Sequence, residues 1–340
     1  MNSLGFNKKE CDTKVVVAMS GGVDSSVAAV MLKKQGYEVI GVTLKLYNSS
    51  NTTKSKSCCA GKDIDDAKKV ANQYNFPHFT FDYQSNFFSG VIDNFVETYA
   101  NGETPVPCIR CNQTVKFTDL LLEARKMKAD ALVTGHYARR VGGTNNSKLL
   151  KAKDSSKDQS YFLFATLNEQ LDFLRFPLGE FLKSDIRNMA KDFNLIVNDK
   201  PDSQDICFVT SDSYRNLINN LKPEINIEGN ITDVDGNVLG KHKGIANYTV
   251  GQRKGIGIGG NEKPLYVVKV DKEKNLIVLG TEDKLKKRKI KFNNINWLDS
   301  SIIPKNLNCK AKIRSTQKEV SGLLNIIDNE GEFEFDISLN

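Results

Sequence analysis

The sequence is poor in histidine and has no long apolar run. Its 340 residues include three histidines, one tryptophan and eight prolines. A metal site built mainly from imidazole ligands is therefore excluded. No apolar stretch approaches the ~18 residues that cross a bilayer, and the mean hydropathy is −0.40. The first fourteen residues, MNSLGFNKKECDTK, lack the apolar centre of a signal peptide. We expect a soluble, cytoplasmic protein with no membrane partner.

Cysteine is also scarce. Seven cysteines in a chain of this length do not suggest a disulfide framework, and an odd number fits a reducing compartment. In such a compartment Cys108 and Cys111, within PVPCIRCNQ, form the kind of pair that is more often metal-binding, redox-active or catalytic than structural. The net charge of +7 and the pI near 8.8 are compatible with a nucleic acid partner, but do not require one.

The most informative stretch is a strand, a glycine turn, a helix and a second strand. Val15–Met19 is an apolar run of strand length, and Ser26–Gln35 has a helical apolar face that ends at Gly36. Glu38–Leu44 reads as the second strand. This order predicts a doubly wound parallel sheet.

The turn SGGVDS, residues 20–25, predicts a phosphate site. Gly21 and Gly22 let backbone amides converge at the positive end of the helix dipole. Ser20 and Ser25 add hydroxyl donors, and Asp24 is placed to bind Mg²⁺ or to orient the loop. No GK[ST] follows, so the turn is not the loop of NTPases that release the γ-phosphate. It resembles the SGGxDS loop of enzymes that cleave ATP to AMP and pyrophosphate. The alternative is a glycine turn that serves only packing.

Several further motifs occur in a fixed order. They are SGGVDSS, SCCAGKDIDDAKKVA, TPVPCIRCNQTVKF, LVTGHYAR, KDQSYFL, FPLG, KPDSQDICFV and YTVGQRKGIGIGG. Together they resemble the tRNA-specific 2-thiouridylases, which place sulfur at C2 of the wobble uridine of tRNA, over nearly the whole chain. The resemblance implies an adenine nucleotide α-hydrolase-like sheet domain, the cofactors ATP and Mg²⁺, and tRNA as a partner. It also implies a cysteine desulfurase or sulfur-relay protein as sulfur donor.

Replacing a carbonyl oxygen by sulfur needs an activated oxygen, a sulfur nucleophile and a thiol that frees the sulfur from its carrier. The resemblance assigns the nucleophile to Cys111 and the persulfide to Cys207, with a transient disulfide between the two. A helix predicted from Asn112 onwards would favour the Cys111 thiolate, as would Arg110 and Lys116 if they turn inward. Two alternatives stay open: an incidental pair, or an iron–sulfur cluster held by Cys108, Cys111 and Cys207.

The same resemblance implies the other site residues. The target base would lie against Val106, Pro107 and Cys108, although many relatives have Asn and Asp at the first and last of these positions. ATP would contact Ala18, Met19, Ser20, Gly21, Gly22, Val23, Asp24, Ser25, Leu44 and Gly135. The tRNA would contact Lys157, Asp158, Gln159, Arg314 and Ser315, where Ser315 replaces a tyrosine common in relatives.

Other candidates receive lesser roles. Beside Gly135, His136 is expected to shape the site, and His78 to begin a strand. The adjacent Cys58 and Cys59 are expected to pack in the core or a loop, and Cys11 and Cys309 have no motif around them.

Length and pattern predict three consecutive domains. A sheet domain is expected over residues 1–165, a small helical or mixed domain carrying Cys207 over 166–228, and a C-terminal antiparallel β-barrel over 229–340. Asp235–Gly236 is a hairpin signal. Relatives continue past Asn340, so a barrel that ended there would lack its closing strands and expose an edge. Besides the thiolase, the sequence leaves open a small-acid ligase and a tRNA-binding protein whose catalysis is impaired by the short C-terminus.

Overall fold

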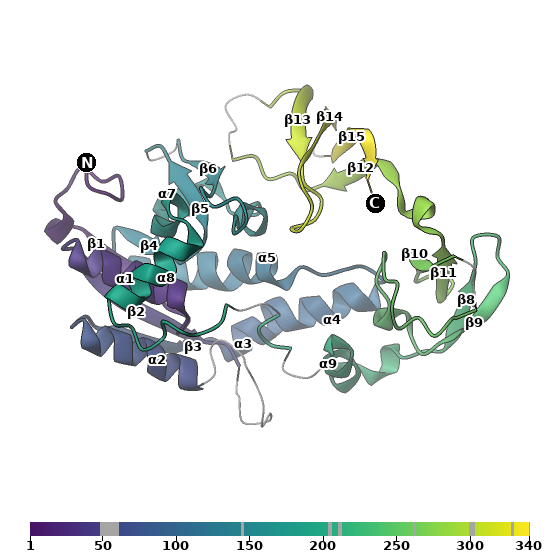
Figure 1. The fold of residues 1–340 in the computed structure, drawn as a ribbon, viewed down its shortest axis with the longest axis horizontal. Helices are drawn as coiled ribbons and strands as arrows, with labels where there is room; N and C mark the ends of the chain where they lie inside the picture. Colours follow the sequence, from purple (N-terminus) through teal and green to yellow (C-terminus); the bar gives the residue numbers. More distant parts are fainter. Residues whose placement is uncertain are drawn as a thin grey trace. The chain divides into compact units, whose positions relative to one another are not determined.

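A computed structural model describes residues 1–47, 61–143, 146–202, 206–209, 213–260, 263–298, 303–327 and 330–339. The chain divides into two compact units (Figure 1). The first comprises Met1–Val91, Cys108–Thr210 and Asn296–Ser301, and the second comprises Ile92–Pro107, Ser211–Ile295 and Ile302–Asn340. Cys58 and Cys59 lie outside the described residues. No described helix is long and apolar enough to cross a membrane.

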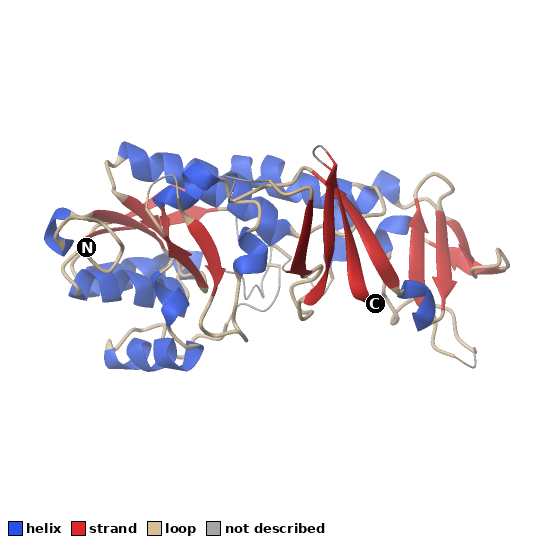
Figure 2. Cartoon of the chain, turned by 90° about the horizontal axis from the view of Figure 1, so that it is seen from above, coloured by secondary structure: helices blue, strands red, loops and turns tan. Residues whose placement is uncertain are grey.

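The first unit is built on a five-stranded parallel sheet, as the sequence predicts. The strand order is β3-β2-β1-β4-β7, and every neighbouring pair is parallel. Helices cover both faces of this sheet (Figure 2). The strands are β1 (Lys14–Ala18), β2 (Glu38–Lys45), β3 (His78–Asp82), β4 (Ala131–Val133) and β7 (Leu174–Arg175).

Strand β1 lies at the point where the winding reverses. The chain proceeds outward from β1 to β2 and β3, and then returns to β4 on the other side of β1. Open α/β sheets bind their ligands at the carboxyl ends of the strands at such a switch point. The three valines of β1 are fully buried, because both faces of the strand are covered.

The helical segments of the first unit match the sequence pattern in most places. The helix predicted at 26–35 is α1 (Val23–Lys34), and a further helix, α8, spans Lys183–Asp192. The helix predicted from Asn112 begins earlier, at Pro107, as α5 (Pro107–Cys111) followed by a π-helical segment η4 (Asn112–Leu120). The other segments are η1 (Glu10–Asp12), α2 (Gly61–Gln73), α3 (Gln84–Phe87), η3 (Phe88–Ile92), α6 (Leu121–Lys126), η5 (Ser160–Leu163), α7 (Asn168–Phe173), η6 (Pro177–Glu180) and the hairpin β5 (Ala138–Val141) and β6 (Lys148–Lys151).

The division into units differs from three consecutive domains. Residues 166–210 belong to the first unit, because β7 extends the parallel sheet beside β4. Ile186 and Ala190 of α8 are fully buried in the same apolar core as Val27 of α1. The segment that leads to Cys207 is therefore part of the sheet unit.

The second unit is rich in strands, as expected, but it contains two sheets. One is antiparallel throughout, in the order β12-β15-β14-β13, and the other is mixed, in the order β10-β11-β8-β9. In the mixed sheet β8 and β11 are parallel, contrary to the expected antiparallel pattern. The long connection between them allows this pairing. The strands are β8 (Gly229–Thr232), β9 (Val238–His242), β10 (Tyr266–Asp271), β11 (Leu276–Gly280), β12 (Lys287–Asn293), β13 (Asn306–Ala311), β14 (Val320–Ile327) and β15 (Glu330–Leu339).

Helices and local turns complete this unit. Asp235–Gly236 forms the predicted hairpin turn between β8 and β9, with φ of +92° at Gly236. Tyr99 of α4 stacks on Tyr214 of α9, with ring centroids 4.6 Å apart. The last described strand, β15, pairs on both sides, so the edges of its sheet are β12 and β13. The segments are α4 (Asp93–Ala100), α9 (Tyr214–Leu221), η7 (Pro223–Ile225), η8 (Ile245–Asn247) and η9 (Glu282–Leu285).

Candidate functional site

The loop between β1 and α1 leaves a helix N-terminus open. Helix α1 has 12 residues, and its N-cap residue Gly22 makes no side-chain cap hydrogen bond. The Ser20 amide donates to Ser25 Oγ at 3.1 Å, and Ser25 Oγ donates to the Gly22 carbonyl at 3.3 Å. The first-turn amides and the helix dipole therefore make a site suited to an anion. The predicted ATP contacts from Ala18 to Ser25 all lie on this loop and its flanks.

Two glycines shape the loop through close approaches. Gly21 has φ of +72°, and a Cβ there would lie 2.1 Å from the Asp63 carbonyl oxygen. Gly135 follows β4, and a Cβ there would lie 2.9 Å from the Ser25 backbone nitrogen. A side chain at either position would displace the loop. Leu44, in β2, is 7% exposed, near the carboxyl end of its strand. The expected ATP residues thus meet at one edge of the sheet.

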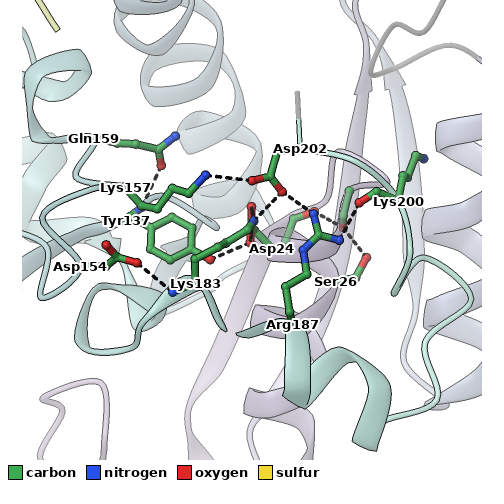
Figure 3. A network of polar contacts seen from close by, with 12 residues as sticks. Asp24, Ser26, Tyr137, Asp154, Lys157, Gln159, Lys183, Arg187, Lys200 and Asp202 are labelled. Atoms are coloured by element: carbon green, nitrogen blue, oxygen red, sulfur yellow. Dashed lines mark hydrogen bonds and ion pairs between the residues drawn. The ribbon is translucent and has the colours of Figure 1, made fainter. Parts of the chain in front are cut away.

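A set of charged groups lies beside the loop (Figure 3). Lys183, at the start of α8, donates to Asp24 Oδ1 at 2.7 Å and Oδ2 at 2.8 Å, and lies 3.0 Å from Asp202 Oδ1. The Tyr137 hydroxyl donates to Asp24 Oδ1 at 2.8 Å. Asp202 also pairs with Arg187. Burial acts to raise the pKa of Asp202, but these cations, Lys183 foremost, hold it at about 2.

The side chain of Lys200, which lies in the chain between α8 and Cys207, also contacts the loop. Its ammonium donates to the Gly21 carbonyl at 2.8 Å and to Asp66 Oδ2 at 3.0 Å, and also pairs with Asp63. Burial acts to lower the pKa of Lys200, but the hydrogen bonds to Asp63 and Asp66 raise it above its ordinary value. Lys200 and Asp202, which precede Cys207 in the chain by seven and five residues, are thus held beside the anion loop.

Cys111 ends α5 and is 7% exposed. Burial raises the pKa of its thiol, against the charge of Lys116, which lowers it, while Cys108 acts to raise it further. Arg110 does not turn towards the thiol, since its Nε donates to the Gly90 carbonyl at 3.1 Å. The expectation that the helix start favours the thiolate is therefore wrong here. The helix begins five residues earlier than predicted, and loss of hydration outweighs the charge of Lys116.

Cys207 is half-buried, and neither it nor Cys111 is in a disulfide. The next residue, Phe208, packs edge-on against Phe87 of α3, with ring centroids 5.6 Å apart. Gly90, which accepts the hydrogen bond from Arg110, lies three residues after Phe87, or about one helical turn. The neighbours of both cysteines therefore contact one short helical run.

Cys108 shares α5 with Cys111, but its side chain is exposed. Val106 is 39% exposed and Pro107 is buried at the first position of the helix. Within the described ranges, no three His, Cys, Asp or Glu side chains are grouped so that they could hold one metal ion. Cys108, Cys111 and Cys207 are accordingly not gathered as ligands of a cluster.

The two histidines considered in the sheet unit are both partly buried and neutral. Burial lowers the pKa of His136 to about 3, and its Nδ1 lies 2.8 Å from Thr134 Oγ1. Burial also lowers the pKa of His78 to about 4. His78 begins β3, as predicted. His136 packs edge-on between Phe117 and Phe176, which suits a shaping role.

The three residues expected to contact tRNA beside the sheet are partly engaged within the protein. Asp158 Oδ1 accepts from the Ala152 amide at 2.9 Å, and Gln159 Oε1 accepts from the Tyr137 amide at 2.8 Å. Lys157 Nζ lies 3.1 Å from Asp202 and remains 42% exposed. Of the three, Lys157 is the one with charge available to an RNA phosphate. The roles of Asp158 and Gln159 in reading bases stay predictions.

In the second unit, Arg314 and Ser315 are exposed in the turn between β13 and β14. A Cβ on Gly251 would lie 3.8 Å from both terminal guanidinium nitrogens of Arg314. The glycine-rich stretch 251–260 therefore runs beside the arginine expected to contact tRNA.

Sequence reasoning missed the cations and carboxylates around the loop. Lys200 and Asp202 stand in KPDSQDICFV, and Asp63 and Asp66 stand in GKDIDDAKK, yet neither motif shows which residues pair. The spacing of Asp63 and Asp66 on one face of α2 was the available signal. Lys183 lay in no motif.

Comparison with known proteins agrees with this arrangement. The domain described as tRNA methyl transferase HUP domain matches residues 13–211, and the tRNA methyl transferase PRC-barrel domain matches residues 216–281. The tRNA-specific 2-thiouridylase MnmA of Rhodospirillum centenum is 48% identical over 97% of this chain and 86% of its own length. Those of Paracoccus denitrificans and Ehrlichia ruminantium are 49% and 52% identical, over 96% and 91% of this chain and 84% of their own lengths. The resemblance inferred from the motifs is confirmed, and the chain belongs to the tRNA-specific 2-thiouridylase family.

Proposed function

We propose that this protein is an ATP-dependent tRNA sulfurtransferase that converts the wobble uridine of tRNA to 2-thiouridine. The observation that supports it most directly is the hydrogen bond from Lys200, seven residues before Cys207, to the Gly21 carbonyl of the anion loop. One structural unit thus holds a nucleotide-type loop and both thiols that the reaction requires. A cytoplasmic location, where tRNA and ATP are both present, goes with this activity.

The loop residues fit the phosphates of ATP. Uncapped amides of α1 and the hydroxyls of Ser20 and Ser25 supply donors, and Lys183 supplies a positive charge. The Asp24 carboxylate is suited to Mg²⁺, which usually binds one or two carboxylates together with water and substrate phosphates. When bound, the ion would neutralise phosphate charge. Lys183 would then be drawn from Asp24 towards the phosphates.

The proposed chemistry has three steps. The uridine O2 attacks the α-phosphorus of ATP and pyrophosphate leaves. The terminal sulfur of a Cys207 persulfide attacks C2, a C–S bond forms, and AMP leaves with the oxygen. The Cys111 thiolate then attacks the Cys207 sulfur, which releases 2-thiouridine and leaves a Cys111–Cys207 disulfide. An external thiol returns two electrons, and a cysteine desulfurase or relay protein renews the persulfide.

Cys111 must lose its proton in the last step. The buried thiol is neutral in the free protein, since burial raises its pKa. Lys116 is the nearby group whose positive charge favours the thiolate. Cys108 is exposed one turn earlier in the same helix, and we assign it, with Val106 and Pro107, to the target base. A thiol there can act as acid or base only if its surroundings change when tRNA binds.

The test is 2-thiouridine formation and pyrophosphate release by the purified protein, with ATP, Mg²⁺, a sulfide source and unmodified tRNA. Cys111→Ser and Cys207→Ser should each abolish 2-thiouridine, while Cys309→Ser, a half-buried cysteine on β13, should keep activity. Equal activity in all three variants would contradict the proposal. Pyrophosphate release that needs a small acid instead of tRNA would indicate a ligase, and tRNA binding without release would indicate a binding protein.

A further inference from the structure

The second unit contains a basic pocket that has no role in the proposed chemistry. Its volume is about 610 Å³, within the roughly 300–1,000 Å³ of small-molecule sites. It lies between α9, β9, η8 and the glycine-rich stretch. The residues used here are Arg215, Asn219, Lys241, Lys243, Tyr248 and Gly255.

Positive charge dominates the pocket walls. Arg215, Lys241 and Lys243 line it, against one carboxylate, Glu228. Arg215 is held in place, because its Nε donates to the Asn247 carbonyl at 3.0 Å. Lys241, in the edge strand β9, and Lys243, just after its end, are both exposed on either side of buried His242. This excess of positive charge favours the binding of an anionic ligand.

Asn219, one of the lining residues, carries an unsatisfied acceptor. Asn219 Oδ1 is buried and accepts no hydrogen bond from any residue that the structure describes. A buried amide oxygen without a donor is costly, so a ligand N–H would be favoured there. Tyr248 supplies an aromatic wall, and Gly255, with φ of +72°, lets the backbone approach closely. Phosphate, an N–H donor and a flat ring are together the features of a nucleotide.

We propose that this pocket binds one unstacked nucleotide of the tRNA substrate, with its phosphate on Arg215, Lys241 and Lys243 and its base edge at Asn219. The inference rests on the proposed function for the identity of the RNA. The rim continues into exposed Arg253 and Lys254, and Gly251 of the same stretch lies beside Arg314. Cations spaced along one loop suit a chain of phosphates better than the carboxylates of an acidic peptide.

The test measures the binding of fluorescent unmodified tRNA to the full-length protein as a function of salt. Lys241→Ala/Lys243→Ala should weaken binding roughly tenfold and reduce the salt slope by about 1 for each phosphate that is no longer neutralised. Asn219→Leu should weaken it about two- to tenfold without changing the slope. Lys284→Ala, an exposed lysine of the same unit outside the pocket, is the matched control. Because the lysines are exposed, thermal unfolding should be unchanged in the lysine variants.

Steady-state kinetics give a second readout. The pocket variants should raise KM for tRNA while leaving kcat and KM for ATP near the wild-type values. Unchanged tRNA affinity in both pocket variants overturns the inference. The inference is also overturned if the variants bind tRNA normally and instead fail to bind a polyglutamate peptide that the wild type binds.

The two proposals fail separately. If the wild type thiolates tRNA normally and the pocket variants bind tRNA as tightly as the wild type, only the inference about the pocket is contradicted. If the wild type forms no 2-thiouridine but the pocket variants bind tRNA more weakly than the wild type, only the proposed reaction is contradicted.

Discussion

The ammonium group of Lys183 bridges both carboxylate oxygens of Asp24, at 2.7 and 2.8 Å, in the loop that would bind the phosphates of ATP. Its side chain is 12% exposed, and it lies 3.0 Å from Asp202 as well. One lysine therefore balances two carboxylates, one on the loop and one on the segment before Cys207. Phosphate oxygens would compete with both for the same ammonium group.

Lys183→Met should impair nucleotide binding more than folding. It leaves Asp24 and Asp202 without this counter-charge at a site that must accept an anion, so KM for ATP should rise roughly tenfold or more. Tritium-labelled ATP binding and pyrophosphate release measure the effect. Lys191→Met, exposed on the same helix, should behave as wild type. Equal KM values in the two variants would show that Lys183 does not meet the phosphates.

Gly135→Ala should disturb the loop by steric pressure. The new Cβ would lie 2.9 Å from the Ser25 nitrogen and 3.1 Å from the Asp24 carbonyl carbon, so the backbone must shift. We expect about 1–3 kcal/mol of lost stability and weaker ATP binding. Urea unfolding and ATP titration measure these. Gly143→Ala, where a Cβ would meet no atom within 4 Å, is the control and should be neutral.

Lys200→Ala should loosen the segment that carries Cys207. Asp63, whose side chain is 9% exposed, would lose its cation, and Gly21 would lose a donor to its carbonyl. We expect a loss of about 1–3 kcal/mol and faster hydrogen exchange near residues 206–209. Adding Asp63→Asn should recover part of the stability, because it removes the uncompensated charge. Lys153→Ala, at an exposed lysine of the same unit, should change neither quantity.

Cys111 should react slowly with iodoacetamide at neutral pH, and faster as the pH passes the range in which an ordinary cysteine ionises. Burial raises its pKa, so the reactive thiolate is present only above that range. Mass spectrometry of the Cys111 peptide gives the rate. Lys116→Met should move the profile to still higher pH, since Lys116 lowers the pKa. A Cys111 that is alkylated at neutral pH faster than exposed Cys108 would refute the assignment of a buried, neutral thiol.

Local patterns predict the elements of the sheet unit with good accuracy. The apolar run at Val15–Met19, the SGGVDS turn and the helix after it are each recognisable, because strand, turn and helix signals depend on residues close in sequence. The start of α5 at Pro107 differs from the prediction, which begins the helix at Asn112, although proline is well suited to a first helical position.

By itself, the sequence determined the family, the parallel sheet, the anion loop and the two cysteines, because each is carried by contiguous motifs. Only the tertiary structure decided that Lys183, Lys200 and Asp202 surround that loop, that Cys111 is buried enough to stay protonated, and that residues 166–210 join the sheet unit. Ion pairing and loss of hydration depend on which groups meet in space. The partners of Lys200 at Gly21 and Asp66 lie 179 and 134 residues away along the chain, a distance that no local pattern spans.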